Sequence, residues 1–233
     1  MKTKLFLIGL VLFGLSATAQ VNPIPITEDN GARIMTGFES LAFQSDETTF
    51  VNAYLFVVDN VCSVKKDAIV STDFEAHSFK FTMLVGSPED SKLNNVYQMD
   101  VSIRIQDHRM VYYINNMQVI PGKNSLSKTN TLVDKLTPEK RAAHGDILAD
   151  LSVSVTAAMH SFIDFVSNNK PGKVTHWEAV KTANAVKGLT MEEAKLAFGK
   201  PQYVSENRGE VQWMYGSSFY LFFKNGTVSS VIR

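Results

Sequence analysis

Residues 188–233 constrain the fold most, because they specify both ends of a short helix and then the turns that divide a set of strands. Thr190 and Glu193 form the S/T-x-x-E capping box, in which each side chain binds a backbone amide that would otherwise lack a partner at the helix start. Gly199 supplies the left-handed residue after the helix, and Pro201 cannot continue it. The sequence therefore predicts a helix that begins after Thr190 and ends before Gly199.

Three runs rich in apolar and aromatic residues follow this helix. Residues 216–218 separate the first two runs, and Asn225-Gly226 separates the second from the third. Asn-Gly between alternating runs is the strongest short-range signal for a β-hairpin. The predicted strands are residues 211–215, 219–224 and 227–233. The C-terminal stretch is therefore predicted to be a helix packed on a three-stranded meander.

Hairpin geometry predicts which side chains of this meander share a face. A two-residue loop at residues 225–226 sets Phe223 opposite Val228, and in the same register Leu221 lies opposite Ser230. The helices should cover this face. The reverse face carries a candidate binding patch of four apolar side chains: Met214, Tyr220, Phe222 and Val231. A sheet covered on one side is usually polar on the other, so the patch either packs against the N-terminal part of the chain, which we favour, or is exposed for a partner.

The same stretch resembles the C-terminal part of the BamE/SmpA-OmlA family and of the β-lactamase-inhibitor-like domains that share its fold. The matching pattern is G-L-T-x-x-E, then L/F-G-K-P, W-x-Y and F-x-N-G-x-V. The resemblance implies a small domain of two helices and three strands. Members of these families bind other proteins, so the resemblance implies protein binding and no catalytic chemistry.

Residues 1–19 have the pattern of an export leader. Two lysines precede an apolar run, residues 5–15, and Ala17-Thr18-Ala19 matches the A-x-A cleavage site, so the mature chain is expected to start at Gln20. The apolar run is too short to span a bilayer, which takes about 20 residues. No cysteine stands directly after this run, so a lipobox is missing. We therefore expect a periplasmic or extracellular protein with no integral membrane span.

Composition narrows the choice of partners. The chain has 233 residues, with 23 basic and 23 acidic side chains. Because this balance offers no sequence-wide basic field, we expect no nucleic-acid partner and no anionic membrane partner. The single cysteine, Cys62, cannot form an intramolecular disulfide, and its apolar neighbours favour a small buried side chain over a reactive thiol.

The middle of the chain changes from a helical period to a strand-like period and back. Residues 46–61 place apolar side chains at steps of three and four, which predicts a helix. Residues 77–85 and 97–106 alternate between faces, which predicts strands. Residues 32–43 are a candidate first strand. From residue 147 to about residue 166 the helical period returns and predicts a long amphipathic helix.

A two-residue loop at Asp107-His108 specifies the register of the central hairpin. Three apolar pairs then point to one side, namely Ile105 with Met110, Ile103 with Tyr112 and Val101 with Ile114. The opposite side carries polar residues and is expected to be solvated: Asp100, Arg104, Gln106, Arg109, Tyr113 and Asn115.

Two further helix starts are predicted from capping patterns. Thr137 precedes Pro138, which suits the first position of a helix. Thr175 and Glu178 match a second capping box before an apolar stripe that reaches Val186.

Residues 168–173 are polar, contain Pro-Gly and predict a domain boundary. The expected domains are residues 20–168 and 174–233. The first runs helix, antiparallel meander, helix, and through V-Y-Q-M-D-V-S-I-R-I-Q-D-H-R-M-V-Y-Y-I it resembles an exported bacterial domain of unknown function with a TATA-binding-protein-like (TBP-like) fold. That likeness implies a fold without implying DNA binding. The predicted class is α+β, with two small domains that each pack helices on an antiparallel sheet.

No catalytic or cofactor motif occurs in the sequence. A nucleophile elbow, a glycine-rich phosphate loop and H-E-x-x-H are all missing. The nearest metal-like cluster is His144, Asp146 and Asp150, and complementing the dipole of a helix start explains it better. We therefore expect no catalytic residue, no metal and no cofactor.

The predicted function is that of an exported, non-enzymatic module of the cell envelope that binds another envelope or secreted protein through a sheet face. An exported hydrolase inhibitor is the alternative and would present exposed aromatic residues on loops. An enzyme with an unrecognised site is the second alternative and would need several polar residues in one deep pocket. The partner and the oligomeric state are left open by the sequence.

Overall fold

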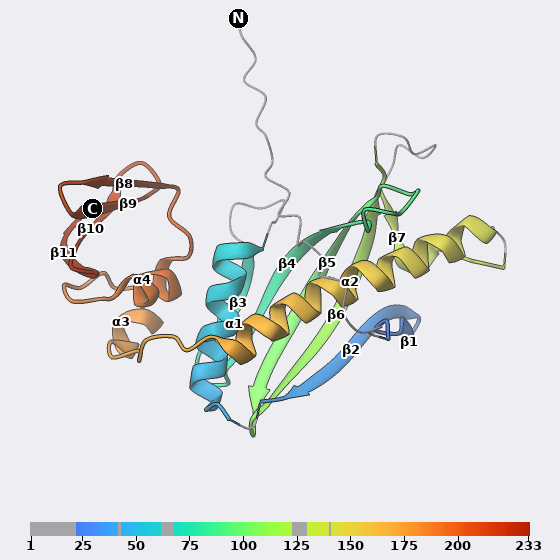
Figure 1. Ribbon diagram of the computed structural model, residues 1–233, viewed down its shortest axis with the longest axis horizontal. Helices are drawn as coiled ribbons and strands as arrows, with labels where there is room; N and C mark the ends of the chain where they lie inside the picture. The colour runs from blue at the N-terminus through green and yellow to red at the C-terminus, as the bar shows by residue number, and fades with distance from the viewer. Residues whose placement is uncertain (1–21, 42, 62–67, 123–129, 140) are drawn as a thin grey trace, which may run out of the picture.

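The computed structural model describes residues 22–41, 43–61, 68–122, 130–139 and 141–233. The predicted leader and Cys62 lie outside these residues. Two antiparallel sheets carry the fold, with helices packed beside them (Figure 1). The predicted α+β class is confirmed.

The larger sheet has seven strands in the order β1-β2-β6-β5-β4-β3, with β7 pairing to β6. They are β1 (Thr27–Asp29), β2 (Ala32–Ser40), β3 (Ile69–Asp73), β4 (Ser78–Gly86), β5 (Val96–Gln106), β6 (Arg109–Ile120) and β7 (Thr131–Leu132). The long hairpin of β5 and β6 forms its centre, and every pairing between neighbours is antiparallel.

The turn between β5 and β6 has the predicted two-residue form. Asp107 and His108 both have positive φ, 53° and 57°. The carboxylate of Asp46 accepts hydrogen bonds from both of their backbone N–H groups, at 3.0 and 2.9 Å, and ties the turn to the start of the first helix. The three predicted pairs are confirmed: Ile105 with Met110, Ile103 with Tyr112 and Val101 with Ile114.

Helix α1 (Asp46–Asn60) occupies the predicted position. Its N-cap is Ser45, whose hydroxyl accepts from the N–H of Thr48 at 3.1 Å. Every residue from Thr49 to Val58 is buried. A helix is apolar all round when other elements surround it, and α1 packs against the larger sheet, α2 (Ala142–Asn168) and α4 (Met191–Phe198).

Helix α2 crosses the same face of the sheet (Figure 1). Its buried stripe consists of Leu151, Val155, Met159, Phe162 and Val166. Among the helices that the structure describes, α2 passes a test of length and composition for a membrane span. The buried stripe belongs to the core cluster under the sheet, as in the core helix of a globular domain.

The helix start predicted at Thr137 and Pro138 is wrong. A short 3₁₀ helix, η1 (Val133–Lys135), precedes these residues, and α2 begins at Ala142. Thr137 donates its N–H to Nδ1 of His144 at 2.9 Å and accepts from the N–H of Arg141 at 3.1 Å. Thr137 and Pro138 therefore belong to the connection that leads into α2.

The smaller sheet has four strands in the order β11-β10-β9-β8. They are β8 (Tyr203–Asn207), β9 (Glu210–Tyr215), β10 (Phe219–Lys224) and β11 (Thr227–Ile232), and α3 (Trp177–Lys181) and α4 precede them. The capping box of Thr190 and Glu193 is confirmed, and Gly199 ends α4 with φ 74°. Strand β8 is a fourth strand that the sequence analysis did not predict. Arg208 and Gly209, both with positive φ, form the turn between β8 and β9.

The second predicted capping box is wrong. The N-cap of α3 is His176, which makes no side-chain cap, and α3 ends at Lys181. The hydroxyl and N–H of Thr175 instead donate to the carboxylate of Glu193, at 3.1 and 2.5 Å. A buried carboxylate from α4 thus takes the partners that the local pattern had assigned to Glu178.

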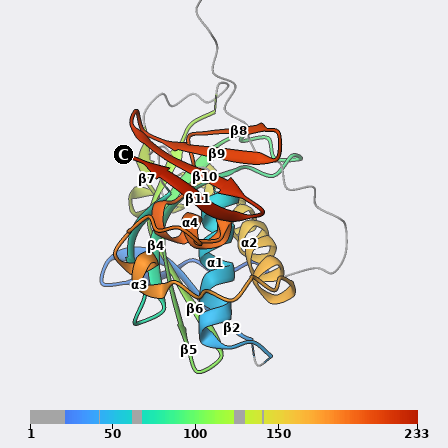
Figure 2. The ribbon, with the colours of Figure 1, turned by 90° about the vertical axis from the view of Figure 1, so that its left-hand side faces the viewer.

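Helices α3 and α4 contact the N-terminal core. Val180 and Leu196 are buried in the cluster under the larger sheet, and the ring of Trp177 lies edge to face with Phe74. Lys195 pairs with Asp59 of α1 at 2.7 Å. Figures 1 and 2 show α4 between the smaller sheet and α1.

Candidate functional site

The smaller sheet is covered on one face. Its buried side chains and those of α4 and the preceding turn form a second core cluster: Leu189, Ala194, Trp213, Leu221, Phe223 and Val228. The predicted pair of Phe223 with Val228 is confirmed, and Leu221 lies opposite Trp213 on the same face. The candidate patch was expected on the opposite face.

A β-bulge changes the membership of that patch. The register of β10 and β11 shifts between Phe222 and Phe223, so that Phe222 opposes Ser230 while Phe223 opposes Val228. Ser229 is the extra residue, and its hydroxyl donates to the carbonyl of Phe222 at 3.0 Å. Side chains alternate between the two faces along a strand. One inserted residue therefore moves each later side chain of that strand to the opposite face of the sheet.

The predicted placement of Val231 is therefore wrong. Leu221 opposes Val231, not Ser230, and Val231 packs against the covered cluster. Ile232 takes its place on the outer face, opposite Tyr220, with 53% of its surface exposed. A two-residue hairpin without a bulge would instead set Ile232 opposite Phe219.

Four side chains form a continuous row across the outer face. Tyr203 opposes Met214, Met214 opposes Tyr220, and Tyr220 opposes Ile232. We call these four residues the outer row. Tyr203 at one edge is 59% exposed, Met214 and Tyr220 are half-buried, and Phe222 stands two residues along from Tyr220 on the same face.

The N-terminal domain does not cover the outer row. Met214, Tyr220 and Phe222 belong to neither core cluster, and no described residue of β8 to β11 lies in the cluster under the larger sheet. The core under the larger sheet contacts α3 and α4, on the other side of the smaller sheet. The packing that we had favoured for the patch is therefore wrong.

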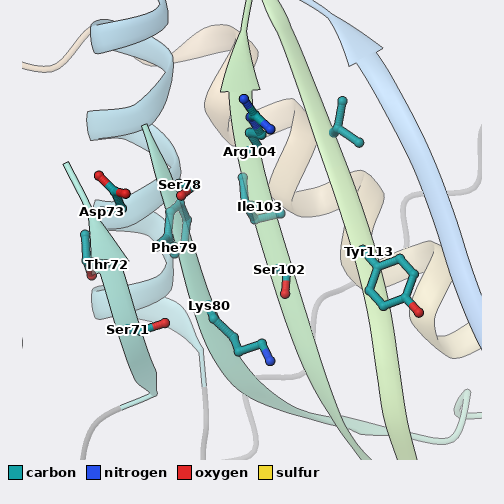
Figure 3. A pocket seen from close by; sticks show the side chains of 11 residues that line it. Ser71, Thr72, Asp73, Ser78, Phe79, Lys80, Ser102, Ile103, Arg104 and Tyr113 are labelled. Carbon is teal, nitrogen blue, oxygen red and sulfur yellow. The ribbon is translucent and has the colours of Figure 1, made fainter. Parts of the chain in front are cut away.

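A second candidate site is a polar hollow on the larger sheet. It has a volume of about 410 Å³ and lies over β3, β4, β5 and β6, on the face turned away from α1 and α2 (Figure 3). We call it the polar hollow; it is lined by Ser71, Thr72, Asp73, Ser78, Phe79, Lys80, Ser102, Ile103, Arg104, Val111 and Tyr113. Sequence reasoning treated this face as merely solvated and missed the hollow, because β3 was not recognised and it completes one wall.

The charged side chains of the polar hollow differ in whether they make hydrogen bonds. Oδ1 of Asp73 accepts from the N–H groups of Glu75 and Ala76, at 3.1 and 2.9 Å, and so holds the turn between β3 and β4. Within the described part of the chain, Lys80 and Arg104 make no ion pair or hydrogen bond. The hollow therefore offers two cations outside any ion pair, and its carboxylate bonds to the neighbouring turn through Oδ1.

The cluster of His144, Asp146 and Asp150 is not a metal site. Asp150 accepts hydrogen bonds from the hydroxyls of Ser87, Ser91 and Tyr97 and so joins α2 to the end of the hairpin of β4 and β5. Burial and the neighbouring Asp150 raise the pKa of Tyr97. No group of three or more His, Cys, Asp or Glu side chains could hold a metal ion among the residues that the structure describes.

Comparison with known proteins supports the fold and says nothing of function. No protein-family model matches the chain, and no curated protein matches it either. A TBP-like protein from Parabacteroides distasonis is similar in structure, with a TM-score of 0.50 and 10% identity over 62% of this chain and 99% of that chain. A DUF4468 family protein from Bacteroides ovatus has a TM-score of 0.49 and 8% identity over 64% of this chain and 94% of that chain.

The first of these likenesses confirms the resemblance to a TBP-like fold that the sequence predicted for the N-terminal domain. The resemblance of the C-terminal domain to the BamE and β-lactamase-inhibitor-like families stays a prediction. The chain is therefore similar in fold to a TBP-like protein.

Proposed function

We propose that this chain is an exported, non-enzymatic binding module of the cell envelope, and that the outer row of the smaller sheet docks a protein partner. The observation that carries the proposal is the continuous apolar row of Tyr203, Met214, Tyr220 and Ile232, which crosses all four strands on a face that no other element of the described chain covers.

The composition of the row supports a protein partner. Aromatic residues and methionine are enriched in protein interfaces, and a few aromatic anchors commonly supply most of the binding energy. Tyr220 also keeps a polar end, because its hydroxyl donates to the carbonyl of Ser217 at 3.2 Å. The leader pattern of residues 1–19 supports the periplasm or the exterior as the place of binding.

Photo-crosslinking tests this proposal. A photoreactive residue at Tyr203 or Ile232 of the exported chain should trap one predominant envelope protein, whereas the same residue at Val153, an exposed apolar position of α2, should not. The substitution Phe222→Asp should abolish the crosslink from Tyr203 and change the free energy of unfolding by no more than about 1 kcal/mol. Equal trapping from Val153, or none from either row position, would refute the proposal.

An exported hydrolase inhibitor is the second candidate, and Phe43 favours it. Its side chain is fully exposed in the connection between β2 and α1, as expected of an aromatic residue that enters an enzyme cleft. The mature chain should then inhibit an exported hydrolase such as a serine β-lactamase, and Phe43→Ser should remove the inhibition. This candidate would be excluded if neither the mature chain nor its Phe43→Ser variant inhibited any member of a panel of exported hydrolases.

A further inference from the structure

The polar hollow carries two cations on one face of the sheet. In the register of β4 and β5, Lys80 opposes Ser102 and Ser78 opposes Arg104. Lys80 and Arg104 are therefore diagonal neighbours on one face, and their Cα atoms are about 7 to 8 Å apart. Both side chains are long enough to contact a group placed between them.

Neither cation forms an ion pair within the described part of the chain. Asp73, the carboxylate that lines the hollow, is held by the turn beside it. Lys181 and Lys195 each form an ion pair, with Glu75 and Asp59. An arginine and a lysine left together without a partner suit the oxygens of a phosphate or carboxylate, to which both donate charge-assisted hydrogen bonds.

The rest of the lining indicates what carries the anion. Four side-chain hydroxyls lie on the same face as the cations, and each can donate and accept a hydrogen bond: Ser71, Ser78, Ser102 and Tyr113. On β6, Val111 opposes Arg104 and Tyr113 opposes Ser102, so an aliphatic group and an aromatic ring form one wall. Val111 is 46% exposed. A ligand with many hydroxyls and an apolar C–H face matches both features.

We propose that the polar hollow binds an acidic saccharide. Its phosphate or carboxylate lies between Lys80 and Arg104, its hydroxyls bond to the serine side chains of β3, β4 and β5, and the C–H face of its ring packs on Val111 and Tyr113. The volume, about 410 Å³, is near the lower end of the range for ligand sites and accommodates one or two sugar rings. This site is independent of the outer row.

Calorimetric titration of the full mature chain tests the site with three probes: glucose 6-phosphate, glucuronate and glucose. At least one charged sugar should bind at least tenfold more tightly than glucose, and the tighter of the two identifies the preferred anion. Lys80→Gln and Arg104→Gln should each weaken that binding about tenfold or more. Arg109→Gln is the matched control, since Arg109 starts β6 beside the hollow without lining it, and it should leave the affinity unchanged.

Amide chemical shifts of the unaltered chain give a second measurement that needs no variant. Titration with the charged sugar should shift the amides of Lys80 and Ser102 and leave those of the outer row in place. The proposal is overturned if no charged sugar binds at millimolar concentration, or if Arg109→Gln weakens binding as much as Arg104→Gln. Tighter binding of a short single-stranded oligonucleotide, lost equally in both arginine variants, would show a general polyanion surface and would also overturn it.

Discussion

The carboxylate of Glu193 lies 2.9 Å from Nδ1 of His176, and this pair joins the first turn of α4 to the segment that enters α3. Glu193 is 1% exposed. It also accepts from the backbone N–H groups of Thr175, His176 and Thr190. One carboxylate thus closes the capping box of α4 and fixes the path of the chain between α2 and α3.

The pKa of Glu193 predicts an acid-sensitive domain. Burial by itself would raise this pKa, but the N–H groups of Thr190 and Thr175 and the contacts from His176 outweigh burial and lower the pKa to about 2. A lowered pKa contributes stability above the unfolded value of 4.5 that is lost as the pH falls toward 2. The loss should reach about 3 kcal/mol.

Urea unfolding at several pH values measures this effect. Glu193→Gln should be less stable than the unaltered chain at pH 7 and should lose less stability between pH 4.5 and pH 2. Glu192→Gln, at the exposed neighbouring position, is the control and should follow the unaltered chain. Parallel curves for Glu193→Gln and the unaltered chain would contradict the assigned role.

The bulge at Ser229 predicts opposite outcomes for two adjacent residues. Val231→Asp should lower the free energy of unfolding by about 2 kcal/mol, because it places a charge against the covered cluster. Ile232→Asp should change it by less than about 0.5 kcal/mol, because that side chain is exposed. Thermal unfolding of the two variants compares them directly. If Ile232→Asp were the more damaging, the strand would follow the register without a bulge.

Asn52 should be important for the junction of α1 and α2. It is 1% exposed, and its Nδ2 donates to the carbonyls of Val166 and Asn169, at 3.2 and 2.6 Å, where α2 ends. Asn52→Leu leaves these carbonyls without that donor and should cost about 1 to 3 kcal/mol in a urea melt. Asn168→Ala removes only an exposed bond within α2 and should cost less than about 1 kcal/mol. Equal losses of stability in the two variants would argue against the role of Asn52 at the end of α2.

The domain boundary at residues 168–173 remains a prediction. Under native conditions trypsin should cut after Lys173, which is exposed, and leave two folded fragments. Because Leu196 is buried in the N-terminal core, the fragments should stay associated in size-exclusion chromatography. Mass spectrometry locates the cut, and circular dichroism of the separated fragments reports their folding. Unfolding of both halves after the cut would show one cooperative unit instead.

Local signals determined much of this protein. The ends of α4, the turns at Asp107-His108 and Asn225-Gly226, and the span of α1 all follow from residues within a few positions of one another. Capping boxes, left-handed turn residues and apolar periods act over that short range, so they are visible in a sequence. The same signals placed Met214, Tyr220 and Phe222 on one face of the smaller sheet.

Only the tertiary structure decided how these elements meet. Glu193 draws Thr175 away from its predicted cap through bonds between residues distant in the chain. One extra residue, Ser229, moves Val231 to the covered face, and nothing in the local pattern distinguishes that bulge from a regular hairpin. The docking of α4 on α1 exposes the outer row, and the pairing of β3 with β4 completes the polar hollow. Long-range packing and pairing are shared properties of several segments, so no single stretch of sequence specifies them.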